Sequence, residues 1–142
     1  MREEHSTHGA NIFTDELSGR LDLSSEETAM YVYDVEPGDS FPYHYEYVEE
    51  WLLVIGGAVV VRVPDGERQL ERGDILRFPP GPDGAHQIMN RGVATARVLL
   101  FSKAALPGIS VYPDTDTIGV WPDEDTEFYF KRRGAVSRED AV

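Results

Sequence analysis

Short apolar segments separated by glycine and proline run along most of the chain, and apolar residues at helical spacing are nearly absent. Segments of this length, rich in aromatic and β-branched residues, predict strands. We expect strands at 29–35, 51–55, 58–63, 75–78, 85–89 and 96–101, with an aromatic strand or strand edge at 41–47. Strand signals at such regular spacing, without helices between them, predict an all-β barrel or sandwich.

The turns predicted between these strands follow from their residues. Gly56-Gly57 is a tight hairpin signal between 51–55 and 58–63. Further turns are expected at Pro37-Gly38-Asp39, Pro64–Glu67, Arg72-Gly73-Asp74 and Asn90-Arg91-Gly92, and the strand 75–78 stops at Pro79-Pro80-Gly81-Pro82. The apolar residues expected to form the core are Phe41, Leu52, Val54, Val59, Val61, Ile75, Phe78, Ile88, Val98 and Leu100.

A chain of 142 residues is the size of one domain that can bury its own core. The two ends differ from the middle. We expect an N-terminal arm at 1–22, a barrel with a C-terminal extension at 23–134 and a flexible tail at 135–142. Ser24–Glu27 has the residues of a helix start, but strand-forming residues follow at once.

Composition narrows the function classes. The net charge of -13 repels phosphate backbones and anionic lipid surfaces, so binding to nucleic acids or membranes is not expected. Absence of cysteine excludes disulfides, thiolate ligands and cysteine nucleophiles. The first residues are polar and lack the apolar core of an export signal, so we expect a cytoplasmic protein.

Three polar residues near position 44 carry candidate chemistry. His44, Glu46 and Glu50 have the same parity, so they share one face if the strand stays regular or a hairpin returns Glu50 to it. One imidazole and two carboxylates then converge, and such a mix of nitrogen and oxygen ligands suits a divalent transition metal. His86 lies in a second apolar run after a loop rich in glycine and proline, from which it can point into the mouth of a barrel.

These two segments resemble the two motifs of the cupin superfamily. Residues 38–57 resemble the first motif, in which a glycine is followed by His-x-His, a glutamate and a closing glycine. Residues 73–90 resemble the second, which has glycine, Pro-x-Gly, histidine and asparagine. The resemblance implies an all-β, single-domain, cupin-type jelly-roll β-barrel with a metal ion inside, held by three histidines and a glutamate.

The resemblance implies metal ligands at His44, Glu50 and His86, but this chain departs from the motifs twice. Glu46 stands where the family has its second histidine, and His86 lies two residues farther from Gly81 than the motif has it. With Glu46 as a ligand the donor set is more anionic and favours manganese, iron or zinc. Otherwise Glu46 is a catalytic base, or the site has lost its metal.

The activity implied by the resemblance is that of a metal-dependent enzyme on a small molecule. Residues 111–116 also look like a segment of small bacterial cupins, some of which are labelled sugar-phosphate isomerases. An isomerase and a dioxygenase both fit the expected site. The alternative is a non-catalytic barrel that binds or senses a small molecule. The family also implies a homodimer, in which the arm 1–22 is a candidate to pair with the partner's sheet edge.

Other notable residues have structural explanations. The aromatic cluster Tyr43, Tyr45, Tyr47 and Trp51 is expected to pack and close the barrel, and Asn90 to form a turn. Arg62, Arg77 and Arg97 are expected to be solvated or paired, and Glu49 to face solvent. His5 and His8 lie in the polar arm and are not expected to be ligands.

Overall fold

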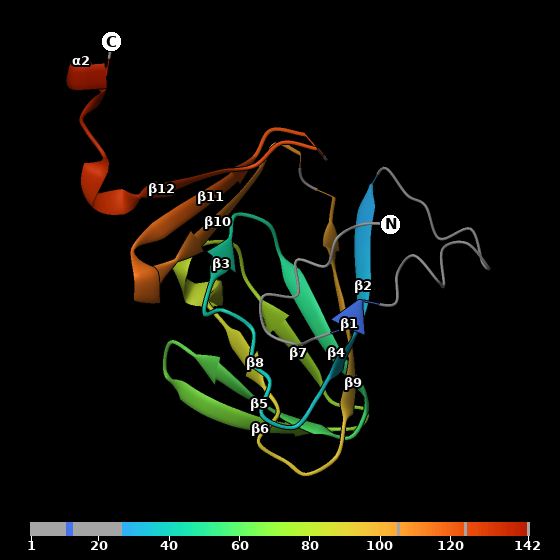
Figure 1. Ribbon diagram of the computed structural model, residues 1–142. Helices are drawn as coiled ribbons and strands as arrows, with labels where there is room; N and C mark the ends of the chain where they lie inside the picture. The colour runs from blue at the N-terminus through green and yellow to red at the C-terminus, as the bar shows by residue number, and fades with distance from the viewer. Residues whose placement is uncertain (1–10, 13–26, 105, 124, 142) are drawn as a thin grey trace.

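The computed structural model describes residues 11–12, 27–104, 106–123 and 125–141 (Figure 1). Its strands are β1 (Asn11–Ile12), β2 (Thr28–Val35), β3 (Tyr45–Glu46), β4 (Glu50–Gly56), β5 (Ala58–Val63), β6 (Gly66–Glu71), β7 (Ile75–Phe78), β8 (Gln87–Met89), β9 (Ala96–Lys103), β10 (Gly108–Tyr112), β11 (Thr117–Trp121) and β12 (Phe128–Lys131). Short 3₁₀ helices occupy Pro82–Gly84, Pro113–Thr115 and Arg132–Gly134, and the helix α2 covers Arg138–Ala141. The described residues are therefore mostly β, as predicted.

The strands form three antiparallel sheets. The first has the order β1-β2-β9-β4-β7, the second β6-β5-β8 and the third β12-β11-β10-β3. In Figure 1 the β6-β5-β8 sheet lies at the lower left, across from β2 and β9 on the right. The core lies between these two sheets. Its buried side chains are Val35, Leu52, Val54, Val59, Val61, Phe78, Ile88, Ala96 and Val98, with Phe41 and Leu100 packed against them.

The hairpin predicted at Gly56-Gly57 is wrong. β4 and β5 lie in different sheets, so the chain turns a corner between them instead of folding back. Gly57 has a φ of 72°, and a Cβ there would lie 2.9 Å from the Thr95 carbonyl oxygen. Only glycine fits a left-handed corner with such a close backbone neighbour.

The core assignment of Ile75 is also wrong, because this side chain is 60% exposed. β7 is the outer strand of its sheet, and its burial alternates, with Leu76 and Phe78 turned toward the core. Ile75 shares the outer face with Arg77, which bonds Glu49 across the surface. The alternation rule would have placed it correctly, since Arg77 marks the outer face.

The C-terminal extension forms most of the third sheet, which the sequence analysis did not resolve into strands. β10 pairs with β3, matching Ser110 with Glu46 and Val111 with Tyr45. β11 then pairs with β10, and β12 with β11. This sheet closes one end of the barrel beside the candidate site and brings residues from β10 next to Glu46.

Some predictions fall mainly outside the described residues. Of the predicted arm, only Asn11 and Ile12 are described. They form β1, which pairs with β2 of the same chain. His5, His8 and the helix start beginning at Ser24 lie outside the described ranges. Among the residues that are described, no helix has the length and apolar character needed to cross a bilayer.

Candidate metal centre

Two histidines from distant segments meet through their backbones. His44, just before β3, and His86, just before β8, form an isolated antiparallel bridge. The His44 N–H donates to the His86 carbonyl at 3.1 Å, and the His86 N–H donates to the His44 carbonyl at 2.9 Å. The two rings therefore lie side by side, with centroids 4.7 Å apart.

A nearby carbonyl group fixes the direction of each ring. His44 Nδ1 lies 3.0 Å from the Pro42 oxygen, and His86 Nδ1 lies 2.8 Å from the Gly84 oxygen. A carbonyl oxygen only accepts, so Nδ1 must be the donor on both rings. The Nε2 lone pairs are thereby left for a ligand, which is the usual second contact of a metal-binding histidine.

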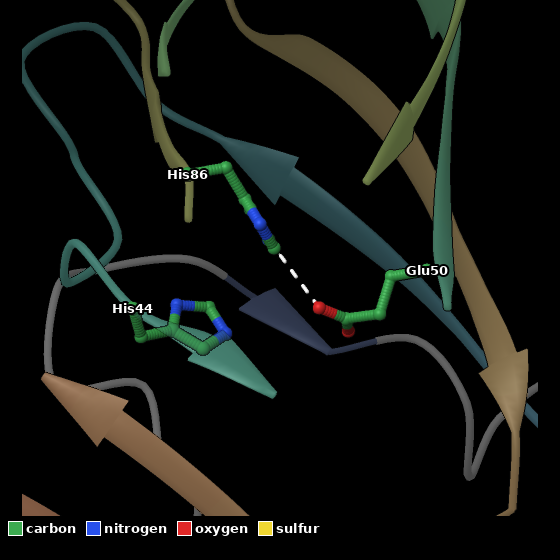
Figure 2. Close-up of side chains that lie close together, drawn as sticks. All are labelled: His44, Glu50 and His86. Atoms are coloured by element: carbon green, nitrogen blue, oxygen red, sulfur yellow. Dashed lines mark ion pairs between the residues drawn. The ribbon is translucent and has the colours of Figure 1, made fainter. Parts of the chain in front are cut away.

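Glu50 completes the cluster from the start of β4. It has the same parity as the buried Leu52 and Val54, so its side chain faces the barrel interior. One Glu50 oxygen lies 3.6 Å from His86 Nε2. Ligand atoms of His44, Glu50 and His86 all lie within 4.8 Å of one another, and Figure 2 shows the three side chains converging from separate segments.

Burial dominates the electrostatics of this cluster. It raises the pKa of Glu50 to about 8, with a further contribution from the nearby Glu46 carboxylate. Burial also lowers the pKa of His86 to about 3, reinforced by His44 and opposed by the Gly84 carbonyl. His86 is therefore a neutral imidazole near pH 7. No cation among the described residues offsets the burial of the Glu50 carboxylate, so its negative charge is costly.

The donor set fits a divalent cation. Two ligands bound at about 2.1 Å to one cation lie roughly 3–3.5 Å apart, close to the 3.6 Å between Glu50 and His86. That distance is too long for a good hydrogen bond, so the two groups do not satisfy each other directly. Imidazole nitrogens and one carboxylate suit manganese, iron(II) or zinc.

Glu46 stands apart from the other three predicted ligands. It does not belong to the group of ligand atoms that meet, and its carboxylate accepts a hydrogen bond of 2.8 Å from the Ser110 hydroxyl. It still lies close enough to Glu50 to raise the pKa of that residue. The structure thus brings together His44, Glu50 and His86 and places Glu46 beside them.

Aromatic rings surround the cluster, and the sequence analysis had not assigned them to it. The Phe78 ring stacks on His86 with centroids 3.7 Å apart, and the Tyr112 ring stacks on His44 at 5.8 Å. Burial raises the pKa of Tyr33, with further contributions from Tyr31 and from the Glu50 and Glu46 carboxylates. The Phe78 and Tyr112 rings thus each pack against one of the two candidate histidine ligands.

The extra residues between Gly81 and His86 form a compact turn. Pro82–Gly84 is a 3₁₀ helix, in which the Gly84 N–H donates to the Gly81 carbonyl at 3.0 Å. A Cβ on Gly84 would lie 1.7 Å from the Pro79 oxygen, so this position requires glycine. The turn absorbs the departure from the motif, and Gly84 itself supplies the carbonyl that orients His86.

The remaining predicted residues have varied outcomes. Arg62, Arg77 and Arg97 all form ion pairs, as expected. Asn90 is 1% exposed and bonds Val35, Ala94 and Gly92, so it ties the turn to β2. The aromatic cluster is divided between two places. Tyr43 and Tyr47 both pack against Tyr45, whereas Trp51 stacks on Phe101.

Sequence comparison identifies relatives of this chain. The Cupin domain family matches residues 31–102, which are about half of the chain. This part contains His44, Glu50 and His86. The Tetracenomycin polyketide synthase protein TcmJ of Streptomyces glaucescens is 39% identical over 67 residues, which cover 46% of this chain and 44% of that protein. The chain thus matches less than half the length of this relative.

Solved structures with the same fold cover more of the chain. A sugar phosphate isomerase of the cupin superfamily from Silicibacter pomeroyi has a TM-score of 0.75, with 20% identity and 98% of each chain covered. The polyketide cyclase RemF from Streptomyces resistomycificus has a TM-score of 0.55, with 18% identity, and the match covers 74% of this chain and 80% of that one. At these identities the likeness shows the fold. The chain belongs to the Cupin domain family, and its fold is the jelly-roll β-barrel of the cupin superfamily.

Proposed function

We propose that this protein is a metal-dependent enzyme that moves a proton on a small carbonyl compound, such as a sugar derivative. The observation that supports this most is the convergence of His44, Glu50 and His86. The Nδ1 atom of each histidine bonds a backbone carbonyl, which leaves the Nε2 lone pair for a metal ion. A divalent ion held there, as manganese, iron or zinc, would polarise a substrate oxygen.

Glu46 is the catalytic base in this proposal. Its carboxylate lies beside the cluster but is held by Ser110, so it stays available for proton transfer while Glu50 serves as the anionic ligand. Isomerisation needs a residue in this role, whereas dioxygen chemistry at an open metal position does not. A sugar phosphate isomerase and a polyketide cyclase share this fold, and both names are compatible with proton transfer next to a carbonyl group.

The proposal also includes a cytoplasmic location, and a homodimer, which the resemblance to small cupins implies. The charge of -13 makes nucleic acids and anionic membranes poor partners. The expected ligand is therefore a small molecule that reaches the barrel interior.

The test combines metal analysis with proton exchange. Protein purified without added metal is analysed for bound manganese, iron and zinc, and a panel of sugar phosphates is incubated with it in deuterated water. Deuterium incorporation is followed by NMR. Glu46→Gln is expected to keep the metal and lose exchange, whereas Glu50→Gln should lose both.

Two results would contradict the proposal. Protein that contains no metal and takes up none from solution would remove the metal site. Metal-loaded protein without exchange on any substrate, but with measurable binding of one of them, would support a non-catalytic binding barrel instead.

A further inference from the structure

β12 presents an unpaired aromatic edge. It is the outer strand of the β12-β11-β10-β3 sheet, and within the described part of the chain it pairs with β11 alone. Phe128, Tyr129 and Phe130 are 49%, 53% and 56% exposed. In Figure 1 this strand lies at the upper left, far from the β6-β5-β8 sheet. An open apolar edge of this kind is a template for another strand.

The backbone of β12 directs one residue of the aromatic triplet toward the open edge. The Arg132 N–H, just after the strand, donates to the Asp116 carbonyl on the β11 side at 2.9 Å. Backbone groups of successive residues point to opposite sides of a strand. The N–H and C=O of Tyr129, three residues earlier, therefore point away from β11 and are positioned to pair with a second chain.

An apolar row leads across the sheet to the same edge. The paired residues in this row are Tyr45, Val111, Ile118 and Phe130. Exposure rises along it from 2% at Val111 to 56% at Phe130. The row is thus covered at its centre and open at β12, where a further apolar side chain would continue it.

The charges around the aromatic triplet identify the strand that fits. Residues 123–127 contain Asp123, Asp125 and Glu127, whereas Lys131, Arg132 and Arg133 follow the triplet directly. Such a segment is complementary to itself when two copies run antiparallel, because the acidic end of each then faces the basic end of the other. A strand of unrelated sequence has no reason to match this order of charges.

We propose that two copies of this chain join through antiparallel β12 strands, with a two-fold axis at Tyr129. In this register Phe128 lies opposite the partner's Phe130, and Glu127 lies opposite the partner's Lys131. The Tyr129 backbone groups of the two copies bond each other, and the two third sheets become one. This interface rests on the homodimer included in the proposed function and is independent of the metal.

The ion pairs across the axis are compatible with the bonds inside each chain. The Lys131 ammonium donates to the Thr115 carbonyl at 2.8 Å and to the Thr117 hydroxyl at 3.1 Å. An ammonium group has three donors, so one remains for the partner's Glu127. Glu127 accepts from the Tyr129 hydroxyl at 3.1 Å, and a carboxylate accepts several such bonds.

Charge exchange tests the register. Glu127→Lys and Lys131→Glu each replace two attractive pairs with two repulsive ones, so each variant should self-associate at least about tenfold more weakly than wild type in sedimentation experiments. An equimolar mixture of the two variants should form dimers again, because both cross-axis pairs are then attractive. Glu67→Lys makes the same charge change at an exposed pair with Arg91 on another sheet, and it should leave the dimer intact.

A single cysteine tests the axis directly, since the natural chain has none. Residues facing each other in a hydrogen-bonded antiparallel pair have Cα atoms about 5.5 Å apart, within the range of a disulfide. Tyr129→Cys should form a covalent dimer on mild oxidation, and Val93→Cys, on a fully exposed loop, should not. A monomeric wild type would overturn both the homodimer and the interface. A dimer insensitive to both charge changes, with no Tyr129→Cys cross-link, would overturn the interface alone.

Discussion

Glu50→Gln should stabilise the metal-free protein while abolishing its metal site. The free glutamate side chain has a pKa of 4.5, whereas burial raises that of Glu50 to about 8 in the folded chain. At pH 7 the folded protein must therefore retain a proton that the unfolded chain releases. Each pH unit above the unfolded pKa costs about 1.4 kcal/mol, which gives roughly 3 kcal/mol at pH 7. A glutamine has no such cost.

The sign of the pH dependence follows from the raised pKa. Well below pH 4.5 both states hold the proton, and the ionisation of Glu50 contributes nothing to the free energy of unfolding. As the pH rises toward 8, the unfolded chain gains by ionising and the metal-free wild type loses stability. Urea unfolding of metal-free wild type and Glu50→Gln across this range should show a difference that grows with pH. A divalent cation should remove it by stabilising the wild type.

Glu49→Gln is the matched control for this experiment. Glu49 is adjacent in sequence but bonds Trp51 and Arg77 at the surface, and these contacts lower its pKa. This variant should bind metal normally and should show no stabilisation between pH 5 and 8. If metal-free Glu50→Gln is no more stable than wild type at pH 7, or the difference does not grow with pH, burial of Glu50 does not destabilise the metal-free protein as proposed.

Three further predictions concern Gly84, Asn90 and Ser110. Gly84→Ala should lower the free energy of unfolding by more than roughly 3 kcal/mol in urea titrations, because the added methyl would meet the Pro79 oxygen at 1.7 Å. Asn90→Ala should cost about 2–4 kcal/mol by the same measurement, since it removes buried hydrogen bonds that join the turn to β2. Ser110→Ala should leave metal content unchanged and lower kcat for proton exchange by about tenfold, because Glu46 loses its positioning bond.

Much of the barrel could be predicted because its signals are local. The strand at 75–78 is found with the predicted bounds, since proline stops it on one side and a glycine turn on the other. The candidate ligands His44 and His86 could be predicted because each lies within a segment that resembles a cupin motif, and their backbone bridge puts these segments side by side. Glu50 has the same parity as Leu52, which correctly predicted that its side chain faces the barrel interior.

What could not be predicted depends on partners distant in the sequence. Two glycines between apolar runs are compatible with a hairpin or with a corner between two sheets. The corner brings the Thr95 backbone close to Gly57, and this contact is not visible in the local sequence. The position of Glu46 depends on Ser110, which lies on a strand of the C-terminal extension. Ser110 is a single polar residue between Ile109 and Val111, and such a break in an apolar strand was an available but overlooked signal.

The place of β9 in its sheet bears on how the protein folds during its own synthesis. β9 lies between β2 and β4 and pairs with both, although it follows them by many residues in the chain. Until residues 96–103 have emerged from the ribosome, β2 and β4 lack their shared neighbour and expose unpaired apolar edges. Barrel formation is therefore a late, cooperative event in translation, and chains interrupted before β9 are expected to depend on chaperones or to be degraded.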